Sequence, residues 1–586
     1  MKRLFGYMRR HWRSYAGGLF ATFLTASFYN FVPMLTKFAV DAAQTGHRTA
    51  LAHYAELIAL VAVVMGTTRW ISRFVIFNTG RDIEYEIRND LFHHLARLGP
   101  DFYQRLRTGD LMSRMVNDIT ALRLLVGMAV LMMTNTPIYF VYALVFMTYL
   151  NRQLTVAAII PAFVLLFGVR KITRALMERS LKVQQELGNI GAKVQESLAG
   201  IHVVKAYTLE QHEAKRFREL NDRYNELGLA LARTRGGLFP TIRASAASST
   251  MIVLIYGGHL VMSGAMSIGD LMAFMLYVTQ LAFQATSLGW TLSIYQRGKA
   301  AMKRIDEIFN ESEQPTVGGP EERLEVDGAI EWQNVSFSYF GSNTNGNGSG
   351  REHPPYALRN INVKVTAGEK LAIVGRTGSG KSTMIKLLGR LIEPTEGHVL
   401  LDGRDLREIP IRALRRTIGV VPQEPTLFSD TLARNIAFGA PDATREEVVH
   451  ASEVAGLAPD VAVLPRGFDT IVGERGMSLS GGQKQRVTIA RLLTYHPSVV
   501  VLDDALSSVD TETERAVLHN LSDSVQGRTT IVVAHRASTV RDADEIIVLD
   551  EGHIAERGTH ETLMAQRGIY AELFQRQLLE EELAQY

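Results

Sequence analysis

The hydrophobic residues are distributed unevenly between the two halves of the chain. In the amino-terminal half they form about six apolar stretches, most of them close to the twenty residues that a helix needs to cross a bilayer. These stretches are roughly residues 15–40, 54–77, 124–150, 154–169, 238–263 and 268–294. Buried helices of a soluble protein would not give so many long apolar runs in one half. The pattern therefore predicts an all-α membrane domain with six spans.

Basic residues are concentrated on one side of the predicted spans. The amino terminus MKRLFGYMRRHWR is basic and predicts an interfacial helix, and the long connections at residues 78–123 and 170–237 are rich in arginine. The connections after spans one, three and five are short and carry few charges. Both termini and both long connections should therefore face the cytoplasm. The long connections also carry helical periodicity, so we expect spans two to five to continue as helices into the cytosol.

The carboxyl-terminal half has a different pattern, in which strands and helices alternate. This alternation predicts an α/β domain with a largely parallel sheet. We expect a membrane domain over residues 1–310, a polar linker at 311–328 and a soluble domain at 329–586. The segment GSNTNGNGSG at 341–350 is too polar and flexible to pack a core, and it predicts a surface insertion.

Composition narrows the possible chemistry. The formal net charge of the 586 residues is only +3, which gives no strong basic field for binding nucleic acid. The chain contains no cysteine, and this excludes disulfides, thiolate metal sites and cysteine nucleophiles. Any catalysis must therefore depend on other groups.

A phosphate-binding loop is the first such group. GRTGSGKST (375–383) follows the apolar strand KLAIV and precedes a helical segment, as the motif G-x-x-x-x-G-K-S requires. In this motif glycines let backbone N–H groups surround a phosphate, the lysine adds a point charge and the serine ligates Mg²⁺. A chance Gly-rich turn is the alternative, and the strand–loop–helix context argues against it. The predicted ATP-binding residues of the loop are Gly375, Thr377, Gly378, Ser379, Gly380, Lys381, Ser382 and Thr383.

An acidic pair follows a second buried strand further along the chain. In VVVLDDALSSVD (499–510) the apolar run ends at Asp503 and Asp504. Asp503 fits the carboxylate that organises a magnesium shell. A phosphate loop and a distant acid occur together in many nucleotide hydrolases, but LSGGQ (479–483) lies just upstream of this strand and narrows the choice.

With these motifs in this order, the sequence resembles the ATP-binding cassette (ABC) transporters, specifically an exporter-type half-transporter with its membrane domain fused ahead of its cassette. The resemblance covers almost the whole chain. Besides the phosphate loop and LSGGQ, it rests on Gln423 in VVPQEPTLF, SSVD (507–510), His535 in VVAHRAST and Tyr339 in VSFSYF. It implies that two cassettes close head to tail, with ATP held between the phosphate loop of one and the LSGGQ of the other.

The resemblance also implies roles for single residues. Tyr339 would stack on adenine, Gln423 would sense Mg²⁺ and the membrane domain, and His535 would steady the γ-phosphate. The LSGGQ residues that would contact the γ-phosphate of the opposite site are Ser480, Gly481 and Gly482, and we also expect Gln483 of this motif to belong to the nucleotide site. The turns near residues 99–104 and 206–211 would dock onto cassettes; solvated helix ends are the alternative reading.

Asp504 departs from the family pattern. Active cassettes of this family place glutamate here, to orient or deprotonate the attacking water. An aspartate carboxylate lies about 1.5 Å further back, because its side chain is one methylene shorter. General-base help is typically worth about 10²–10⁴-fold and requires hydrogen-bond reach to the water. We therefore expect slow hydrolysis at this chain's own site, with ATP binding retained.

An impaired base beside a complete LSGGQ resembles one half of a heterodimeric exporter. The partner chain would then carry the glutamate, and LSGGQ of this chain would complete the partner's site. The alternative is a homodimer in which Asp504 works as the base. The presence of His535 favours this alternative, since degenerate sites in the family sometimes lose that histidine.

The transported compound is harder to infer. Lys37, Arg69, Arg73 and Arg243 lie in or near spans, where ionisable groups are costly, and they suggest an anionic-substrate cavity or snorkelling to the interface. Gln280 and Gln284 share a helix face that lines the pathway or bonds neighbouring helices.

We expect ATP-driven export of small amphipathic compounds, drugs or lipids, across the cytoplasmic (inner) membrane, by alternating access and without nucleic acid as a partner. An importer on the exporter fold and a regulatory ATP-binding subunit are the rival functions. The six spans exclude a soluble nucleic-acid ATPase with a related cassette.

Overall fold

The fold was obtained as a computed structural model. It describes residues 1–106, 108–314, 324–339, 356–473, 479–534 and 537–584, apart from the side chains of 104, 162–170, 173, 238–239, 242, 282, 285–286 and 580–584. The predicted insertion at 341–350, half of the predicted linker (residues 315–323), and His535 lie outside the described residues. The chain forms two compact units, one of Met1–Arg97 with Leu106–Ser312 and one of Leu98–Arg105 with Glu313–Tyr586.

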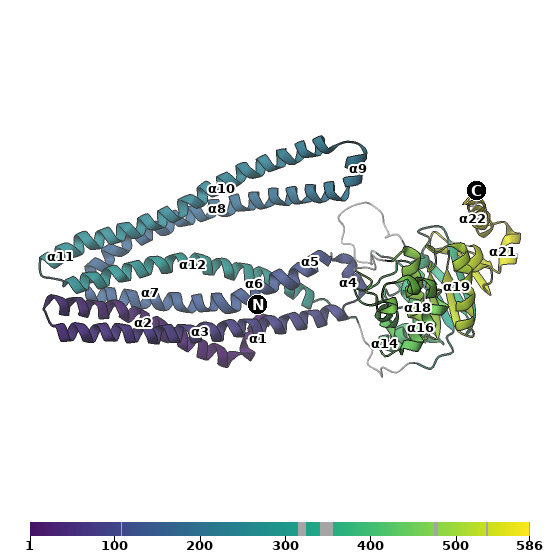
Figure 1. Cartoon of the computed structure of the whole chain (residues 1–586), viewed down its shortest axis with the longest axis horizontal. Helices are drawn as coiled ribbons and strands as arrows, with labels where there is room; N and C mark the ends of the chain where they lie inside the picture. Colours follow the sequence, from purple (N-terminus) through teal and green to yellow (C-terminus); the bar gives the residue numbers. More distant parts are fainter. Residues whose placement is uncertain (107, 315–323, 340–355, 474–478, 535–536, 585–586) are drawn as a thin grey trace. The chain divides into compact units, whose positions relative to one another are not determined.

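The first unit is helical throughout, as predicted. Figure 1 shows α2, α3, α7 and α12 side by side, while α8 and α10 form a hairpin closed by α9. Three π-helical turns, Arg114–Asp118, Leu125–Ala129 and Val253–Gly257, interrupt the helices. Helix α4 (Pro100–Arg105) follows α3 in the chain but is grouped with the second unit. The helices of the first unit are α1 (Lys2–Arg10), α2 (Trp12–Gln44), α3 (Arg48–Arg97), α5 (Thr108–Ser113), α6 (Ile119–Leu124), α7 (Val130–Leu150), α8 (Arg152–Ala199), α9 (Ile201–Ala206), α10 (Glu210–Ile252), α11 (Gly258–Met262) and α12 (Ile268–Phe309).

Each of the six predicted apolar stretches falls on a helix of this unit. Within the described residues, four helical segments are long and apolar enough to cross a membrane, and they are Trp12–Gln44, Arg48–Arg97, Thr108–Leu150 and Arg243–Met262. A shorter apolar helix covers Ile268–Leu281. The fourth, fifth and sixth predicted spans contain residues whose side chains are not described. Helices α3, α8 and α10 run far beyond the apolar stretches, as the periodicity of the long connections predicted.

Small and polar residues bring the membrane helices close together. Thr25 donates a hydrogen bond to Thr68 at 2.9 Å, and the hydroxyls of Thr22 and Ser72 are also bonded, so α2 is joined to α3 in two places. Helix α12 is joined to α2 by bonds of Tyr277 and Gln280 to Asn30, at 2.8 and 3.0 Å. Such interhelical bonds satisfy polar groups that hydrocarbon cannot solvate.

The polar residues singled out in the spans have different environments. Lys37 forms an ion pair with Asp270 at 2.7 Å, so it has a protein partner at the junction of α2 and α12. Gln280 and Gln284 are both buried, and the bond of Gln280 to α2 supports the helix-bonding alternative for that residue. Arg69 is half-buried and lies beside Tyr139 of α7, whereas Arg73 and Arg243 are exposed.

The second unit contains two sheets. The smaller, antiparallel sheet has the order β2-β1-β4-β5 and the larger one the order β10-β9-β3-β8-β7-β6, in which β9, β3, β8, β7 and β6 are parallel. The strands are β1 (Ile330–Phe337), β2 (Leu358–Val365), β3 (Lys370–Gly375), β4 (Glu396–Leu401), β5 (Arg404–Asp405), β6 (Ile418–Val421), β7 (Val499–Asp503), β8 (Thr529–Val533), β9 (Glu545–Asp550) and β10 (His553–Gly558). The predicted α/β cassette with a largely parallel sheet is confirmed.

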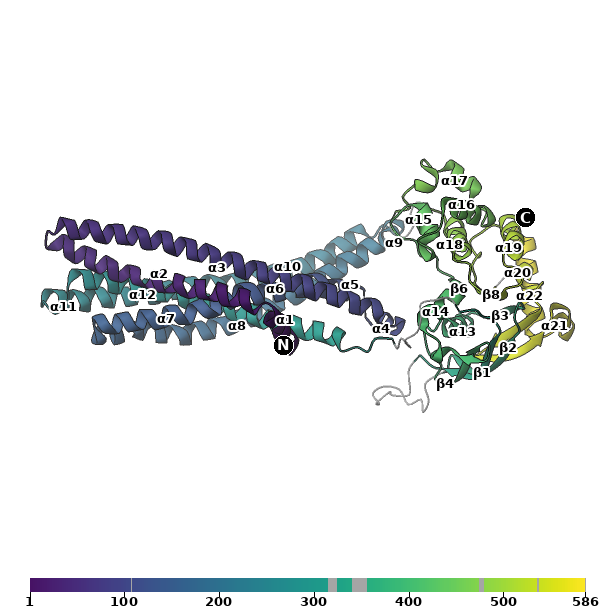
Figure 2. The ribbon, with the colours of Figure 1, turned by 90° about the horizontal axis from the view of Figure 1, so that it is seen from below.

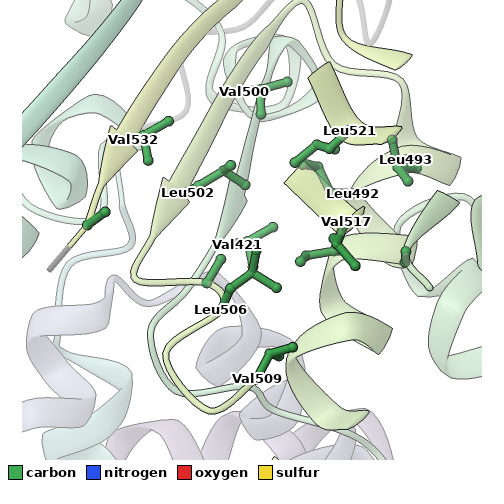
Figure 3. Close-up of a cluster of buried hydrophobic side chains, with 14 of the residues drawn as sticks. Val421, Leu492, Leu493, Val500, Leu502, Leu506, Val509, Val517, Leu521 and Val532 are labelled. Carbon is green, nitrogen blue, oxygen red and sulfur yellow. The ribbon is translucent and has the colours of Figure 1, made fainter. Parts of the chain in front are cut away.

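Helices cover the large sheet on both faces, as the view in Figure 2 shows. One core lies between the two sheets and α13, and the other between the large sheet and a helical layer that includes α16, α18 and α19. Figure 3 shows the second core, in which Leu492 of α18 and Val517 of α19 face Val500 and Leu502 of β7. The helices of the unit are α13 (Lys381–Leu388), α14 (Ile411–Thr417), α15 (Leu432–Ile436), α16 (Arg445–Val454), α17 (Ala458–Val463), α18 (Gly481–Tyr495), α19 (Thr511–Ser524), α20 (Ala537–Val540), α21 (His560–Gln566) and α22 (Ile569–Ala584).

Candidate nucleotide-binding site

The phosphate loop lies between β3 and α13, at the carboxyl edge of the parallel strands. Two of its glycines are required by close backbone contacts. A Cβ on Gly375 would lie 2.2 Å from the carbonyl oxygen of Leu549, and one on Gly380 would lie 2.7 Å from that of Ala357. Gly380 also has φ of +107°, where side chains other than hydrogen are strained. The loop therefore keeps a tight course that leaves its N–H groups for a ligand.

The lysine of the loop is held by the loop's own backbone. Lys381 Nζ donates to the carbonyl oxygens of Gly375 and Arg376 at 2.8 and 2.9 Å. Burial lowers the pKa of Lys381, while the nearby carboxylates of Asp503 and Asp504 act in the opposite direction. The Oγ atom of Ser379 is buried and has no hydrogen-bond partner among the described residues. An unsatisfied hydroxyl and a partly desolvated ammonium both fit a phosphate group placed in this loop.

Oxygen ligands suited to magnesium meet beside the loop. Ser382 Oγ donates to Asp503 Oδ1 at 3.4 Å, although the two residues are 121 positions apart in the chain. Burial raises the pKa of Asp503, whereas the hydrogen bond from Ser382 acts to lower it. The nearby carboxylate of Asp504 raises this pKa further. A cation would offset the cost of this buried charge, and a hydroxyl with a carboxylate is a donor set that Mg²⁺ prefers.

Asp504 has an unusual backbone conformation. Its φ is +48°, in the left-handed region, and its N–H donates to the carbonyl oxygen of Val533 at 2.9 Å. Its carboxylate accepts a long hydrogen bond of 3.5 Å from Gln423 Nε2. Gln423 follows β6, and Asp504 follows β7, so the parallel pairing of these strands brings the two side chains together. Gln423 and Asp504, which were both predicted to be catalytic, thus lie together at the ends of two neighbouring strands.

Tyr339 lies near the same loop. The residue is 47% exposed, its hydroxyl is 3.1 Å from Thr383 Oγ1, and its ring packs edge-on against Phe337 with centroids 4.9 Å apart. An exposed aromatic face fixed at both ends can accept a base. The contact with Thr383 could not be inferred from the sequence.

The LSGGQ motif forms the amino-terminal end of α18. Ser480 is the N-cap: its Oγ accepts from Gln483 N at 3.2 Å, and the Gln483 side chain accepts from Ser480 N at 2.8 Å. Gln483 Nε2 also donates to Asp460 of α17 at 2.8 Å. The capped helix end presents Gly481 and Gly482 with no side-chain bulk, as an approaching phosphate requires.

Sequence reasoning missed two residues behind this motif. Asp460 joins α17 to the motif through Gln483 and an ion pair with Arg486 at 2.9 Å. Gln485 is 2% exposed and bonds Ser507 and Ser508 of the SSVD segment (Ser507–Asp510). A polar residue on the buried face of α18 was the available signal, because buried polar side chains almost always have a partner.

The turn after α3 is grouped with the cassette. The segment Leu98–Arg105 belongs to the same compact unit as residues 313–586, and its side chains of Leu98 and Phe102 are 7% and 3% exposed. A Cβ on Gly99 would lie 4.0 Å from Cδ of Gln314, and Nε2 of Gln314 donates to the backbone oxygen of Arg390 at 2.8 Å. The second turn that was expected to dock, at residues 206–211, belongs to the membrane unit.

A helical membrane domain joined in one chain to a phosphate-loop domain with a capped LSGGQ helix is the architecture of a nucleotide-driven transport protein. Two family models match the chain, the ABC transporter transmembrane region over residues 16–285 and the ABC transporter model over residues 358–507. The chain therefore belongs to the ABC transporters. It is a multi-pass membrane protein of the exporter type that binds ATP and couples ATP hydrolysis to transport.

Full-length relatives agree with this assignment. The chain is 35% identical over 583 residues to the multidrug resistance-like ATP-binding protein MdlA of Escherichia coli (strain K12), covering 98% of this chain and 96% of that protein. It is 31% identical over 588 residues to an ATP-dependent lipid A-core flippase of Syntrophus aciditrophicus (strain SB), covering 100% and 95%. A solved structure of a bacterial Atm1-family ABC exporter with ATP bound matches with a TM-score of 0.78 at 30% identity, covering 96% and 98%.

Proposed function

We propose that this chain is one half of a dimeric exporter that moves small amphipathic compounds, drugs or lipids, across the cytoplasmic membrane, with its cassette in the cytosol. The observation that carries the proposal is that one cassette holds both a phosphate loop fitted to ATP and a capped LSGGQ end with open glycines. Relatives named for multidrug resistance and for lipid A-core flipping support this substrate class. The excess of arginine in the long connections supports the orientation.

Magnesium would be held by Ser382 and Asp503, with Gln423 nearby. When bound, the ion neutralises charge on the β- and γ-phosphates. The chain's own residues do the rest: the loop N–H groups and Lys381 bind phosphate oxygens, and Asp504 orients the attacking water. Gln423 contacts Asp504, so it is placed to report on both the ion and the water.

Hydrolysis at this site would be limited by the reach of Asp504. The side chain is one methylene shorter than glutamate, and its observed contact with Gln423 is long, at 3.5 Å. We therefore favour a heterodimer in which the partner chain supplies a glutamate at its own site. A homodimer with Asp504 as a working base is the competing assembly. The number of subunits in the preparation of this chain alone separates the two, because only the homodimer forms without a partner chain.

The experiment is to purify the full chain alone and co-expressed with a candidate partner, to count subunits in each preparation, and to measure Mg²⁺-dependent ATPase. Asp504→Glu should raise turnover about tenfold or more where this site limits the rate, since general-base help is worth about 10²–10⁴-fold. Unchanged turnover in the assembled complex would contradict the limiting role of Asp504. Uptake of substrate into inverted vesicles tests export against import.

Coupling to the membrane domain would run through α4. The grouping of Leu98–Arg105 with the cassette supports this path, because closure of two cassettes would then move the end of α3. Replacing the buried Phe102 with alanine should reduce transport more than ATPase activity. Equal loss of both activities would instead indicate a general effect on folding.

A further inference from the structure

The side chain of Gln485 connects LSGGQ to the SSVD segment within one cassette. Its Nε2 donates to Ser507 Oγ at 2.9 Å, and its Oε1 accepts from the backbone N–H of Ser508 at 2.9 Å. The residue is 2% exposed. A primary amide carries its donor and its acceptor on separate atoms, so one side chain fixes two neighbouring residues of the segment.

The two motifs are also in direct van der Waals contact. A Cβ on Gly481 would lie 3.2 Å from Ser508 Cβ, and one on Gly482 would lie 2.8 Å from Ser508 O. These glycines therefore allow close packing inside the chain as well as access for a phosphate from outside. A displacement of the amino-terminal end of α18 toward the segment must therefore move Ser508, and the two hydrogen bonds of Gln485 resist a displacement away from it.

The SSVD segment is anchored on its other side to the hydrolytic site. Ser507 N donates to Asp504 O at 3.4 Å, and only two residues separate them. Leu506 and Val509 are 6% and 5% exposed and belong to the same core as Leu492 of α18, as Figure 3 shows. Segment, helix and acid thus form one packed body.

We propose that Gln485 is a positioning residue that couples the two nucleotide sites of the dimer. This rests on the proposed function, in which LSGGQ of this chain holds the partner's ATP while Asp504 serves this chain's own ATP. When the partner's nucleotide draws the end of α18 inward, Gln485 and the glycines carry Ser507 and Ser508 with it. That movement sets the position of Asp504 relative to its water.

A purely structural role makes different predictions. If Gln485 only stabilised the cassette, its loss would lower thermal stability and the active fraction without depending on the residue at position 504. If it positions Asp504, its loss lowers kcat with little change in KM for ATP, because the phosphate loop is untouched. The size of the fall in kcat must also depend on whether residue 504 is aspartate or the longer glutamate.

The test uses the full chain in its assembled dimer, reconstituted in lipid nanodiscs. Where the partner is a different chain, its own catalytic glutamate is replaced by glutamine, so that the measured turnover comes from the site that Asp504 serves. Gln485→Met keeps the length of the side chain and removes both hydrogen bonds, so it leaves little cavity. Ser507→Ala removes one of the two bonds. Lys484→Met, on the same helical turn, is the matched control. We expect kcat to fall about tenfold for Gln485→Met and about threefold for Ser507→Ala, with KM changed less than about twofold and the control unchanged.

A double-mutant cycle then separates the inference from the proposed function. Combining Gln485→Met with Asp504→Glu should be non-additive, because the longer acid compensates for a misplaced segment. Additive effects on kcat would overturn the coupling role. A rise in KM for ATP as large as the fall in kcat would overturn it too. Asp504→Glu alone without effect would overturn the limiting-base proposal, and the kcat and KM of Gln485→Met would still decide the coupling role.

Discussion

The ion pair between Lys37 and Asp270 offers a direct test of the membrane domain. The two residues are 2.7 Å apart, and their side chains are 19% and 17% exposed. Lys37 lies on α2 and Asp270 in the first turn of α12, so the pair joins two helices that are distant in sequence. We expect Lys37→Met to destabilise the domain, since it leaves the carboxylate without its cation.

The magnitude follows from the geometry. At 2.7 Å and an effective dielectric constant of about 20, Coulomb attraction is about 6 kcal/mol, and desolvation of both groups offsets part of it. Removing one partner of a pair buried to this degree costs about 3 kcal/mol. Asp270 also accepts from Ser267 N at 3.0 Å, which retains part of its solvation. The double variant Lys37→Met/Asp270→Asn removes both charges and should cost only about 1 kcal/mol.

The assay is thermal unfolding of the detergent-solubilised full chain, followed by intrinsic fluorescence at one heating rate for all variants. Lys37→Met should unfold at the lowest temperature, and the double variant should recover most of the loss. The exposed Arg48, on the loop-facing end of α3, is a suitable control for removal of a single positive charge. If the double variant were as unstable as the sum of the single variants, the two charges would not interact, and the reasoning would be refuted.

Three further predictions concern the cassette. Lys381→Met should lower ATPase activity by at least about 100-fold in a steady-state assay, because it removes the charge aimed at the phosphates. Gly482→Ala should cost about 1–3 kcal/mol of stability, since its methyl group would lie 2.8 Å from Ser508 O, whereas Gly473→Ala, with nothing within 4 Å, should be neutral in the same melting assay. Although burial acts to raise it, hydrogen bonds from Arg407 and His398 hold the pKa of Asp405 well below its ordinary value. This carboxylate therefore stabilises the fold fully above about pH 4 and loses that effect as the pH falls toward its lowered folded-state pKa, so Arg407→Gln should destabilise at pH 7 and differ from wild type progressively less as the pH is lowered below about 4.

Much of the fold could be predicted because its signals are local. The apolar stretches mark helices by length alone, and the phosphate loop carries its strand, turn and helix within residues 370–388. Apolar composition also identified β7 and placed Asp503 at its carboxyl end. In each case the property is a feature of neighbouring residues, which periodicity and spacing record directly.

The contacts that define the sites depend instead on tertiary packing. Gln485 and Ser508 are 23 residues apart, and Lys37 meets Asp270 only because α2 and α12 pack together. Nothing in the local sequence of either partner specifies the other. The sequence could place Lys37 in a span and mark it as costly, but it could not identify the carboxylate that lowers the cost. Likewise the left-handed backbone of Asp504 follows from the turn between β7 and the SSVD segment, which no motif encodes.

That backbone conformation leads to a last prediction about Asp504. Aspartate is several-fold enriched in the left-handed region, whereas glutamate is not, and φ at this residue is +48°. Asp504→Glu should therefore cost about 0.5–1 kcal/mol of stability, because the longer side chain loses this conformational preference. The same change should raise turnover, since the carboxylate gains about 1.5 Å of reach. Opposite signs for stability and activity would show that glutamate acts through reach and not by improving the fold.

A variant that melted at a higher temperature and also turned over faster would contradict this account, because a better-ordered site would then explain the gain. Asp504→Asn is the matched control: it retains the left-handed preference, lacks the charge, and should leave stability nearly unchanged while ATPase activity at this site is lost.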